Sequence, residues 1–467
     1  MAQAVARYVC LNAGFQHQKK RFRQLTLYRR RLGLHQLRIG PAWRAPDWTP
    51  TGGSEQMQEN YTHSGGRGYL AIPGPSVIPD EVLQAMHRPS PNIYAGDLLT
   101  LTDSLIPDLK AVARTKHSVA IYIANGHGAW EAALMNTLQP GDRVLVPSSG
   151  RFAIGWAEMA EALGIEVEIL DFGTEAAWDF ERIAEALKAD IGHQFKAVLG
   201  VHTDTSSSIR NDVAALRHLM DELQHPALLM ADCIASLGCD RFEMDLWGVD
   251  VMVSACQKGL MTPAGISFVF FNDKAAAARA RLPRISQYWD WSPRANPEVF
   301  YQYFGGTAPT HHLYGLRAAL DLIHAEGMEQ VWARHARLAQ AIWTACEAWG
   351  DIEDPSKGLR FNAPSRALRS HAVTALHLPS PKASDLRAWL ESNLGLTLGI
   401  GLGLAPSDSP AWHGHFRLGH MGHVNGHMIM GLLGGIETGF KALSIPHGAG
   451  ALEGAAKVFS AKATDLL

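Results

Sequence analysis

The 467-residue sequence is poor in several features that mark specialised classes of protein. It has only five cysteines, and no two of them have the CxxC spacing of common zinc and redox motifs. It has no run of about 18 apolar residues, so no membrane-spanning helix is expected. Its net charge of −3 gives no sign of a nucleic-acid or anionic-membrane partner. The sequence also lacks the pattern of a secretory signal. Together these missing features favour a globular protein of a reducing compartment, and we expect the protein in the cytoplasm.

The first 56 residues differ from the rest in charge. Up to Trp48 they hold ten lysines and arginines against one acid, Asp47. An organelle-targeting sequence, a basic arm for an acidic partner, or an over-extended reading frame before Met57 would each explain this bias. We favour the third interpretation, because the segment shows no sustained period of 2 or 3.6 residues. Residues 1–56 are therefore expected to be a disordered or non-native extension.

From residue 118 onward, short apolar runs alternate with helical stretches. This pattern predicts a mostly parallel sheet that is buried on both faces, with one antiparallel strand where the last run follows its predecessor without a full helix. After about residue 315 a long helical stretch precedes a smaller α/β unit. We expect an α/β protein with a large doubly wound domain in residues 57–315 and a small C-terminal domain in residues 316–467. The seven runs are Val119–Ala124, Arg143–Pro147, Ile165–Leu170, Lys196–Val201, Ala227–Ala231, Val249–Ser254 and Ile266–Phe271.

Two consecutive strands of this pattern deliver an acid and a lysine. One run ends at Asp232, and the next leads into Lys258, which is 26 residues further on. Ligands of open parallel sheets bind just beyond the carboxyl ends of the strands, so both side chains are expected at the same edge. A desolvated lysine has a lowered pKa and can form a Schiff base, and an aspartate can keep a pyridine nitrogen protonated. The pair predicts a pyridoxal 5′-phosphate (PLP) site, although a solvated lysine and a loop acid remain the alternative.

A glycine-containing turn follows the first strand. Asn125-Gly126-His127-Gly128 leads into a helix that begins near Ala129. Glycine lets backbone N–H groups approach an anion, and a helix N-terminus favours negative charge. Such a turn is common for purely geometric reasons, so its weight comes from lying on the same sheet edge as Asp232 and Lys258.

These segments together resemble class V, fold-type I PLP-dependent aminotransferases, in the branch that uses alanine, serine or aspartate with glyoxylate. The resemblance runs from about residue 68 to residue 455. Besides the turn described above, its most specific pieces are Pro73-Gly74-Pro75, the segment 201–207, Asp232-Cys233-Ile234-Ala235-Ser236, Gln257-Lys258-Gly259, Gly306-Thr307-Ala308-Pro309 and Phe416-Arg417-Leu418-Gly419.

The resemblance implies a role for each matching residue. Lys258 is the Schiff-base lysine and Asp232 the partner of the pyridine nitrogen, which makes them the catalytic pair. The other cofactor-binding residues are Asn125, Gly126, His127 and Gln257 at the phosphate, Ser206 at the ring oxygen, and Ile234 and Phe152 on the two ring faces. For Phe152, an ordinary core aromatic is an equally good interpretation. Thr307 matches a phosphate contact from a second subunit, which implies a homodimer with shared active sites, or a higher oligomer built from it.

Arg417 matches the arginine that binds the substrate α-carboxylate, with Gly74 and Tyr94 on the substrate side. Physical chemistry supports the role of Arg417 independently, because an arginine in an apolar Phe-Arg-Leu strand is costly unless an anion pairs with it. The cluster of histidines between His413 and His427 has no accompanying cysteine or acid group, so no metal site is expected.

The expected reaction is transamination from serine, alanine or aspartate to a small 2-oxo acid such as glyoxylate or pyruvate. Two alternatives stay open. The segment from Asn92 to Leu98 departs from the run that many relatives carry near the substrate entrance. A relative that transaminates pyridoxamine with pyruvate also has a tyrosine near the position of Tyr94. The enzyme could therefore act on such an amine, or it could be a PLP lyase.

Overall fold

The computed structural model describes residues 63–461. Their strands form two β-sheets, one larger and one smaller. The expected extension of residues 1–56, and Cys10 with it, lie outside the described residues. The described residues form one compact unit that holds both sheets. No helix in the described part of the chain is long and apolar enough to cross a membrane.

The larger sheet has seven strands in the order β2-β8-β7-β6-β5-β3-β4. Six strands are mutually parallel in direction, and β8 pairs antiparallel with both β2 and β7. The expected mostly parallel seven-stranded sheet with one antiparallel strand is thereby confirmed. Its strands are β2 (Ser118–Tyr122), β3 (Arg143–Ser148), β4 (Glu166–Asp171), β5 (Phe195–Val201), β6 (Leu228–Asp232), β7 (Val251–Ala255) and β8 (Ser267–Phe271).

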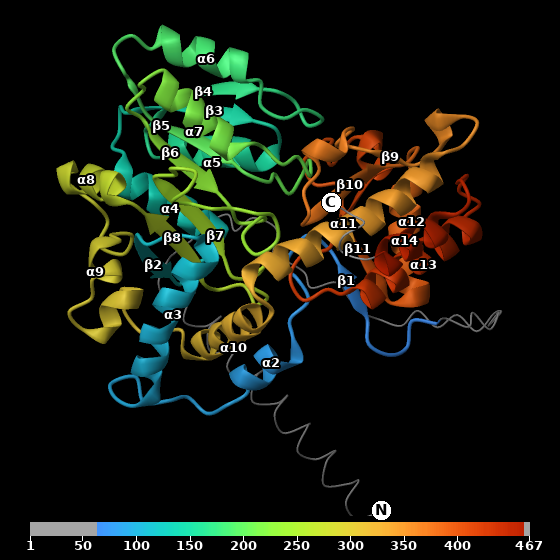
Figure 1. The fold of residues 1–467 in the computed structure, drawn as a ribbon, viewed down its shortest axis with the longest axis horizontal. Helices are drawn as coiled ribbons and strands as arrows, with labels where there is room; N and C mark the ends of the chain where they lie inside the picture. The colour runs from blue at the N-terminus through green and yellow to red at the C-terminus, as the bar shows by residue number, and fades with distance from the viewer. Residues whose placement is uncertain (1–62, 462–467) are drawn as a thin grey trace, which may run out of the picture. The chain divides into compact units, whose positions relative to one another are not determined.

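Helices cover both faces of this sheet, as Figure 1 shows in cyan, green and yellow. Alternate residues of β2 belong to different hydrophobic clusters: Val119 and Ile121 to one, Ala120 and Tyr122 to the other. This alternation is what a strand buried on both faces requires. The helices of this part are α2 (Asp80–Met86), α3 (Asp97–Ala113), α4 (Gly126–Thr137), α5 (Arg151–Ala162), α6 (Phe180–Ala189), α7 (Val213–Glu222), α8 (Asp273–Arg281) and α9 (Ser292–Ala295).

Two long helices, α10 (Thr310–Glu326) and α11 (Met328–Gly350), lead into the smaller sheet. The long helical stretch expected after about residue 315 is interrupted between them by Gly327, whose φ of +82° lies where one helix ends and the next begins. The remaining helices are α12 (Lys382–Leu394), α13 (Gly426–Ala442) and α14 (Ala451–Ser460), and short 3-10 turns lie at Phe300–Phe304, Pro355–Lys357, Arg366–Leu368 and Pro410–Gly414.

The smaller sheet has five strands in the order β1-β11-β12-β10-β9. Its strands are β1 (Tyr69–Ala71), β9 (Arg360–Phe361), β10 (Val373–His377), β11 (Leu396–Ile400) and β12 (His415–Gly419). Strand β1 pairs parallel with β11, which joins residues 69–71 to the C-terminal sheet rather than to the large one. The segment that follows β1 therefore runs from the smaller sheet to the carboxyl edge of the larger one, where Ser76 hydrogen-bonds to Gln257 and Lys258.

Candidate functional site

A cavity of about 250 Å³ lies at the carboxyl edge of the larger sheet. Polar side chains reach it from the ends of β5, β6 and β7 and from the turn after β2. Its lining residues are Gly74, Pro75, Asn125, Gly126, His127, Trp130, Phe152, Thr203, Thr205, Asp232, Ile234, Ala235, Gln257, Lys258 and Ala264. The structure thus brings together eight of the residues singled out in the sequence for cofactor or catalysis, plus Gly74.

Lys258 is buried, with 9% of its surface exposed. Its Nζ donates a hydrogen bond to the carbonyl oxygen of Pro73. Burial, together with the nearby charge of Arg417, lowers the pKa of Lys258 to about 8, while Asp232 acts in the opposite direction. The neutral amine is therefore far more accessible near physiological pH than it is for a solvated lysine.

Asp232 ends β6 and is 4% exposed. Its carboxylate accepts hydrogen bonds from Trp130 Nε1 at 2.9 Å and from the amide of Ile234 at 2.7 Å. Burial nevertheless raises the pKa of Asp232 to about 7, because those two bonds do not offset the loss of solvent. No residue in the described part of the chain forms an ion pair with this carboxylate, so a cationic group in the cavity would stabilise its charged form.

The turn after β2 forms one wall of the cavity. Asn125 caps α4, and its Oδ1 accepts from the amides of His127 at 3.1 Å and Gly128 at 3.4 Å. A Cβ on Gly126 would lie 2.3 Å from Ile234 Cδ1, so a larger residue there would require the Ile234 side chain to move. Burial lowers the pKa of His127, and the charge of Arg151 adds to the effect. The turn therefore presents a neutral imidazole and a helix N-terminus to the cavity.

Glycine is also required at position 74. Its φ of +95° lies in the left-handed region, and a Cβ there would come within 2.5 Å of the Lys258 side chain. The chain after β1 can therefore pass close to the lysine only because residue 74 has no side chain.

Arg417 lies on β12 and is 6% exposed. Its Nε donates to the carbonyl oxygen of Ile400 at 2.6 Å, and its Nη1 donates to that of Thr205 at 2.8 Å. Burial lowers the pKa of Arg417 to about 10, against the opposing effect of Asp204. Within residues 63–461 no carboxylate forms an ion pair with it. A buried guanidinium held by two backbone carbonyls is prepared to bind an anion.

Ser206 does not line the cavity. Its hydroxyl donates to Asp204 Oδ1 and accepts from the amide of Arg151 at 2.9 Å. The neighbouring Thr205 lines the cavity instead. Thr205 to Ser208 all carry hydroxyl groups, and the role of Ser206 at the ring oxygen stays a prediction.

Thr307 and Tyr94 lie together, but in another cavity of about 550 Å³. Tyr94 is 85% exposed. Within one chain the structure does not bring either residue to Lys258.

Sequence reasoning missed two residues of the site. Trp130 fixes Asp232 through Nε1, and its ring contacts His127 edge-on, with centroids 4.7 Å apart. Asp204 accepts hydrogen bonds from the amides of Phe152 and Ser206, both at 2.9 Å, and so holds the start of α5 beside the cavity. A tryptophan in the first turn after the glycine-rich segment was the available signal for Trp130. An acid inside a hydroxyl-rich run was the signal for Asp204.

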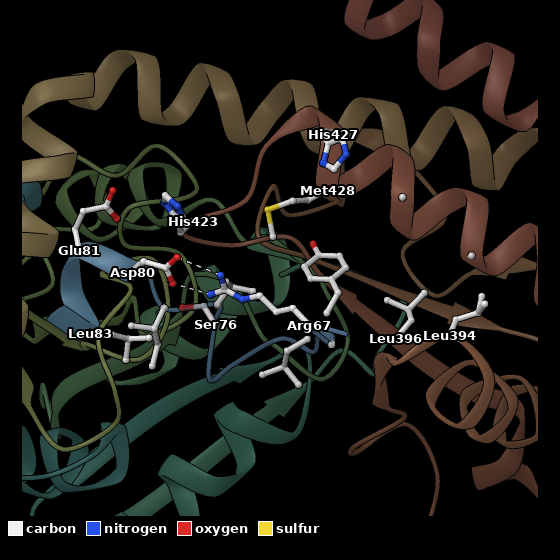
Figure 2. Close-up of a pocket in the computed structure, with 17 residues that line it drawn as sticks. Arg67, Ser76, Asp80, Glu81, Leu83, Leu394, Leu396, His423, His427 and Met428 are labelled. Carbon is white, nitrogen blue, oxygen red and sulfur yellow. Dashed lines mark hydrogen bonds and ion pairs between the residues drawn. The ribbon is translucent and has the colours of Figure 1, made fainter. Parts of the chain in front are cut away.

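The largest of the cavities described, about 800 Å³, is a different one and holds none of these residues. It lies beside β1, α2 and α13, and Figure 2 shows Arg67 reaching Asp80 across its floor. Arg67 Nη2 lies 2.8 Å from Asp80 Oδ1, but both side chains are exposed, so the pair contributes little. No buried acid or base lines this cavity, so its size alone does not make it the catalytic centre.

Comparison with known proteins identifies the family of the chain. Residues 108–409 match the family model described as aminotransferase class-V. The chain is 35% identical to a serine–glyoxylate aminotransferase of Arabidopsis thaliana, over 83% of this chain and 94% of that protein. It is 33% identical to an L-aspartate–glyoxylate aminotransferase of Paracoccus denitrificans, over 81% and 92%. The solved structure of an alanine–glyoxylate aminotransferase from Nostoc sp. superposes with a TM-score of 0.71, at 26% identity, over 80% of this chain and 96% of that one.

Proposed function

Since this chain belongs to the class V aminotransferases, which depend on PLP, we propose that it transfers the amino group of serine, alanine or aspartate to a small 2-oxo acid such as glyoxylate or pyruvate. The observation that carries the proposal is a buried lysine and a buried aspartate that line one cavity, with the buried guanidinium of Arg417 hydrogen-bonded to Thr205, another residue of its lining. The relatives named for serine and aspartate donors support the same substrate class.

The residues of the cavity fit the cofactor. Asp232 is a buried acid without a cationic partner, which suits a protonated ring nitrogen. The side-chain oxygen of Gln257 is buried without a hydrogen-bond partner among the described residues, so a bound group can complete its interactions after rotation of the amide. We propose that Asn125, Gly126, His127 and Gln257 hold the phosphate at the start of α4.

The ring is proposed to lie between Ile234 and Phe152, and both line the cavity. We place the Thr205 hydroxyl, in place of Ser206, at the ring oxygen, because Ser206 is engaged with Asp204 and Arg151.

When bound, PLP supplies an electron sink for the negative charge that develops as a proton leaves the substrate Cα. Lys258 Nζ would hold the cofactor, and as a neutral amine it would act as the general base for that proton, which its pKa of about 8 permits. Asp232 holds a proton at the ring nitrogen. Arg417 binds the substrate carboxylate with its planar donor fork and so orients the Cα–H bond. Gly74 leaves room for the substrate next to Lys258.

We further propose a cytoplasmic homodimer. The four cysteines that the structure describes are all free and buried, as in proteins of reducing compartments. Thr307 and Tyr94 lie away from the cavity within one chain, and a partner subunit would supply them to its neighbour's active site.

Replacing Arg417 tests the substrate class. Arg417→Lys should weaken the binding of serine, alanine and aspartate by about 2–5 kcal/mol, because the bidentate fork of the guanidinium is lost. This corresponds to a loss of roughly 30-fold to several thousand-fold in apparent affinity. Each half-reaction is followed by the change in cofactor absorbance under single-turnover conditions. Pyridoxamine, which has no carboxylate, serves as the control and should be affected little.

Two results would reject this assignment. If the half-reactions of all three amino acids are unchanged in Arg417→Lys, the carboxylate binds elsewhere. If the wild type ignores the three amino acids and converts pyridoxamine or eliminates a leaving group, one of the alternative reactions is correct.

A further inference from the structure

The loop between β5 and α7, residues 202–212, connects the catalytic cavity with the smaller sheet. Thr203 and Thr205 line the cavity. The carbonyl oxygen of Thr205 accepts a hydrogen bond at 2.8 Å from Nη1 of Arg417, which belongs to β12 of the smaller sheet. The position of the Arg417 guanidinium relative to the cavity therefore depends on this loop.

The same loop also holds the strand beside Arg417. Ser208 Oγ accepts a hydrogen bond from the amide of Ala375 in β10 at 3.1 Å, and the carbonyl oxygen of Ser208 accepts one from the amide of Ser370 at 3.2 Å. Ala375 lies opposite Arg417 in the antiparallel pairing of β10 with β12. Contacts with one loop thus place both the backbone and the guanidinium of Arg417.

Asp240 is a fully buried acid that connects this loop with the residues before β10. Its Oδ2 accepts hydrogen bonds from the hydroxyl of Ser370 at 2.6 Å and from that of Thr203 at 3.1 Å. Its Oδ1 accepts from the amide of His371 at 2.8 Å, and Arg210 Nη1 lies 3.9 Å from the same oxygen. One carboxylate therefore joins a residue of the catalytic cavity to the start of the strand that supports Arg417.

The charge of Asp240 strengthens these contacts. Burial alone would raise the pKa of Asp240, but the nearby His371 and Arg210 outweigh this effect and hold the pKa below its usual value. The carboxylate is therefore ionised at neutral pH, and hydrogen bonds to an ionised acceptor are stronger than those between neutral groups. If the carboxylate were removed, several buried donors would lose their acceptor, which is costly in free energy.

We propose that Asp240 is a positioning residue, which sets the affinity for the substrate carboxylate by holding Arg417 in place. Asp240 does not itself line the catalytic cavity, so it acts through the loop on one side and through β10 on the other. A planar guanidinium binds a carboxylate through two parallel hydrogen bonds only when its orientation is fixed, so a shift of its supports weakens the substrate. This inference rests on the proposed function, because it takes Arg417 as the residue that binds the carboxylate.

Single-turnover kinetics of the holoenzyme test the proposal. The probe is whichever of serine, alanine and aspartate reacts best with the wild type. The dependence of the rate on its concentration gives a dissociation constant and a maximal rate separately. Asp240→Ala should raise the dissociation constant at least about 10-fold, with a smaller effect on the maximal rate.

Asp250→Ala is the matched control, because it also removes a buried acid. Asp250 is 3% exposed and accepts a hydrogen bond from the amide of Leu229 at 2.8 Å. It lies just before β7, at the other end of that strand from Lys258. Urea unfolding should show that Asp240→Ala and Asp250→Ala are both less stable than the wild type. The dissociation constant of the amino acid should change only in Asp240→Ala.

A double variant tests whether Asp240 acts through Arg417. If it does, Asp240→Ala should cause no further loss of affinity in a protein that already carries Arg417→Lys, whereas independent effects would multiply. Should Asp240→Ala fail to fold, Ser370→Ala removes one contact of the same carboxylate. It should raise the dissociation constant about 3-fold, again only when Arg417 is present.

The inference is overturned if Asp240→Ala, or Ser370→Ala in its place, keeps the wild-type dissociation constant. It is also overturned if Asp250→Ala raises that constant equally, or if the effects of the Asp240 and Arg417 substitutions multiply. A wild type that reacts with none of the three amino acids would instead reject the proposed function itself, and this inference with it.

Discussion

Burial moves the pKa values of Lys258 and Asp232 toward each other. The lysine falls to about 8 and the aspartate rises to about 7, in each case mainly because the charged form loses solvent. Two groups that ordinarily titrate more than six units apart thus both change charge near neutral pH. Such convergence is typical of catalytic sites, where protons must move at physiological pH.

Removal of the lysine amine should stop the reaction and leave the fold intact. We expect Lys258→Ala to lower transamination by roughly 10²–10⁴-fold or more, because both the covalent anchor and the general base are lost. Steady-state assays measure the loss, and circular dichroism checks the fold. Lys196→Ala, on an exposed lysine at the far end of β5, is the control. Near-wild-type turnover in Lys258→Ala would place the chemistry elsewhere.

The raised pKa of Asp232 predicts a pH-dependent stability of the cofactor-free protein. The carboxyl titrates at 3.8 when unfolded and at about 7 when folded, so the folded state binds the proton more tightly. Its contribution to stability is therefore full below about pH 4 and is lost as the pH rises to about 7. Asp232→Asn does not titrate.

We expect the free energy of unfolding of the apoprotein to fall, relative to that of Asp232→Asn, by on the order of 2–4 kcal/mol between about pH 5 and pH 8. Urea unfolding of both proteins at the two pH values measures the difference. A difference that does not change with pH would show that the folded carboxyl titrates normally. With PLP bound, activity should fall strongly in the same variant, because an amide cannot stabilise a protonated ring nitrogen.

At the scale of elements, helix α5 depends on an acid that lies far from it in sequence. Asp204 is fully buried and accepts from the amides of Phe152 at 2.9 Å and Ala153 at 3.3 Å. These are N–H groups of the first helical turn, which have no partner within the helix. A Cβ on Gly150 would come within 2.4 Å of this carboxylate, so the approach requires glycine.

Asp204→Ala should lower the free energy of unfolding by about 2–4 kcal/mol, because several buried donors lose their acceptor. Asp179→Ala removes an exposed cap from α6 and is the matched control, with an expected loss of about 1 kcal/mol. Urea unfolding of the holoenzymes compares them. Equal losses would mean that Asp204 acts only as an ordinary cap.

The long-range parts of the fold were the hardest to predict from sequence. All seven strands of the larger sheet follow from apolar runs of the sequence. Strand β1 has only three residues, and its place in the smaller sheet depends on pairing with β11, more than 300 residues away. A local pattern carries no information on such a partner.

In the candidate site, too, some residues could be predicted from the sequence and others could not. Asp232 and Lys258 follow from strand ends, because the topology of a parallel sheet fixes their edge. Trp130 and Thr205 depend on which way a side chain points, from the first turns of α4 and from the loop after β5 respectively. That direction is set by backbone geometry, which the periodicity of the sequence does not specify.

At the scale of the whole molecule, Thr307 and Tyr94 are two predicted site residues that line a different cavity from the one that holds Lys258. If each subunit of a homodimer supplies Thr307 to the other, an active site contains Lys258 from one chain and Thr307 from its partner. Two variants that are each inactive should then complement one another.

We expect Lys258→Ala and Thr307→Arg homodimers to have little activity, the first for lack of the amine and the second because a bulky side chain enters the phosphate site. Unfolded and refolded together in equal amounts, they should recover about a quarter of wild-type activity, since half of the dimers are mixed and each mixed dimer holds one intact site. Refolding each variant alone is the control, and light scattering confirms the dimer. If Thr307 served its own chain, both sites of a mixed dimer would carry a defect. A mixture no more active than the separate variants would therefore exclude shared sites.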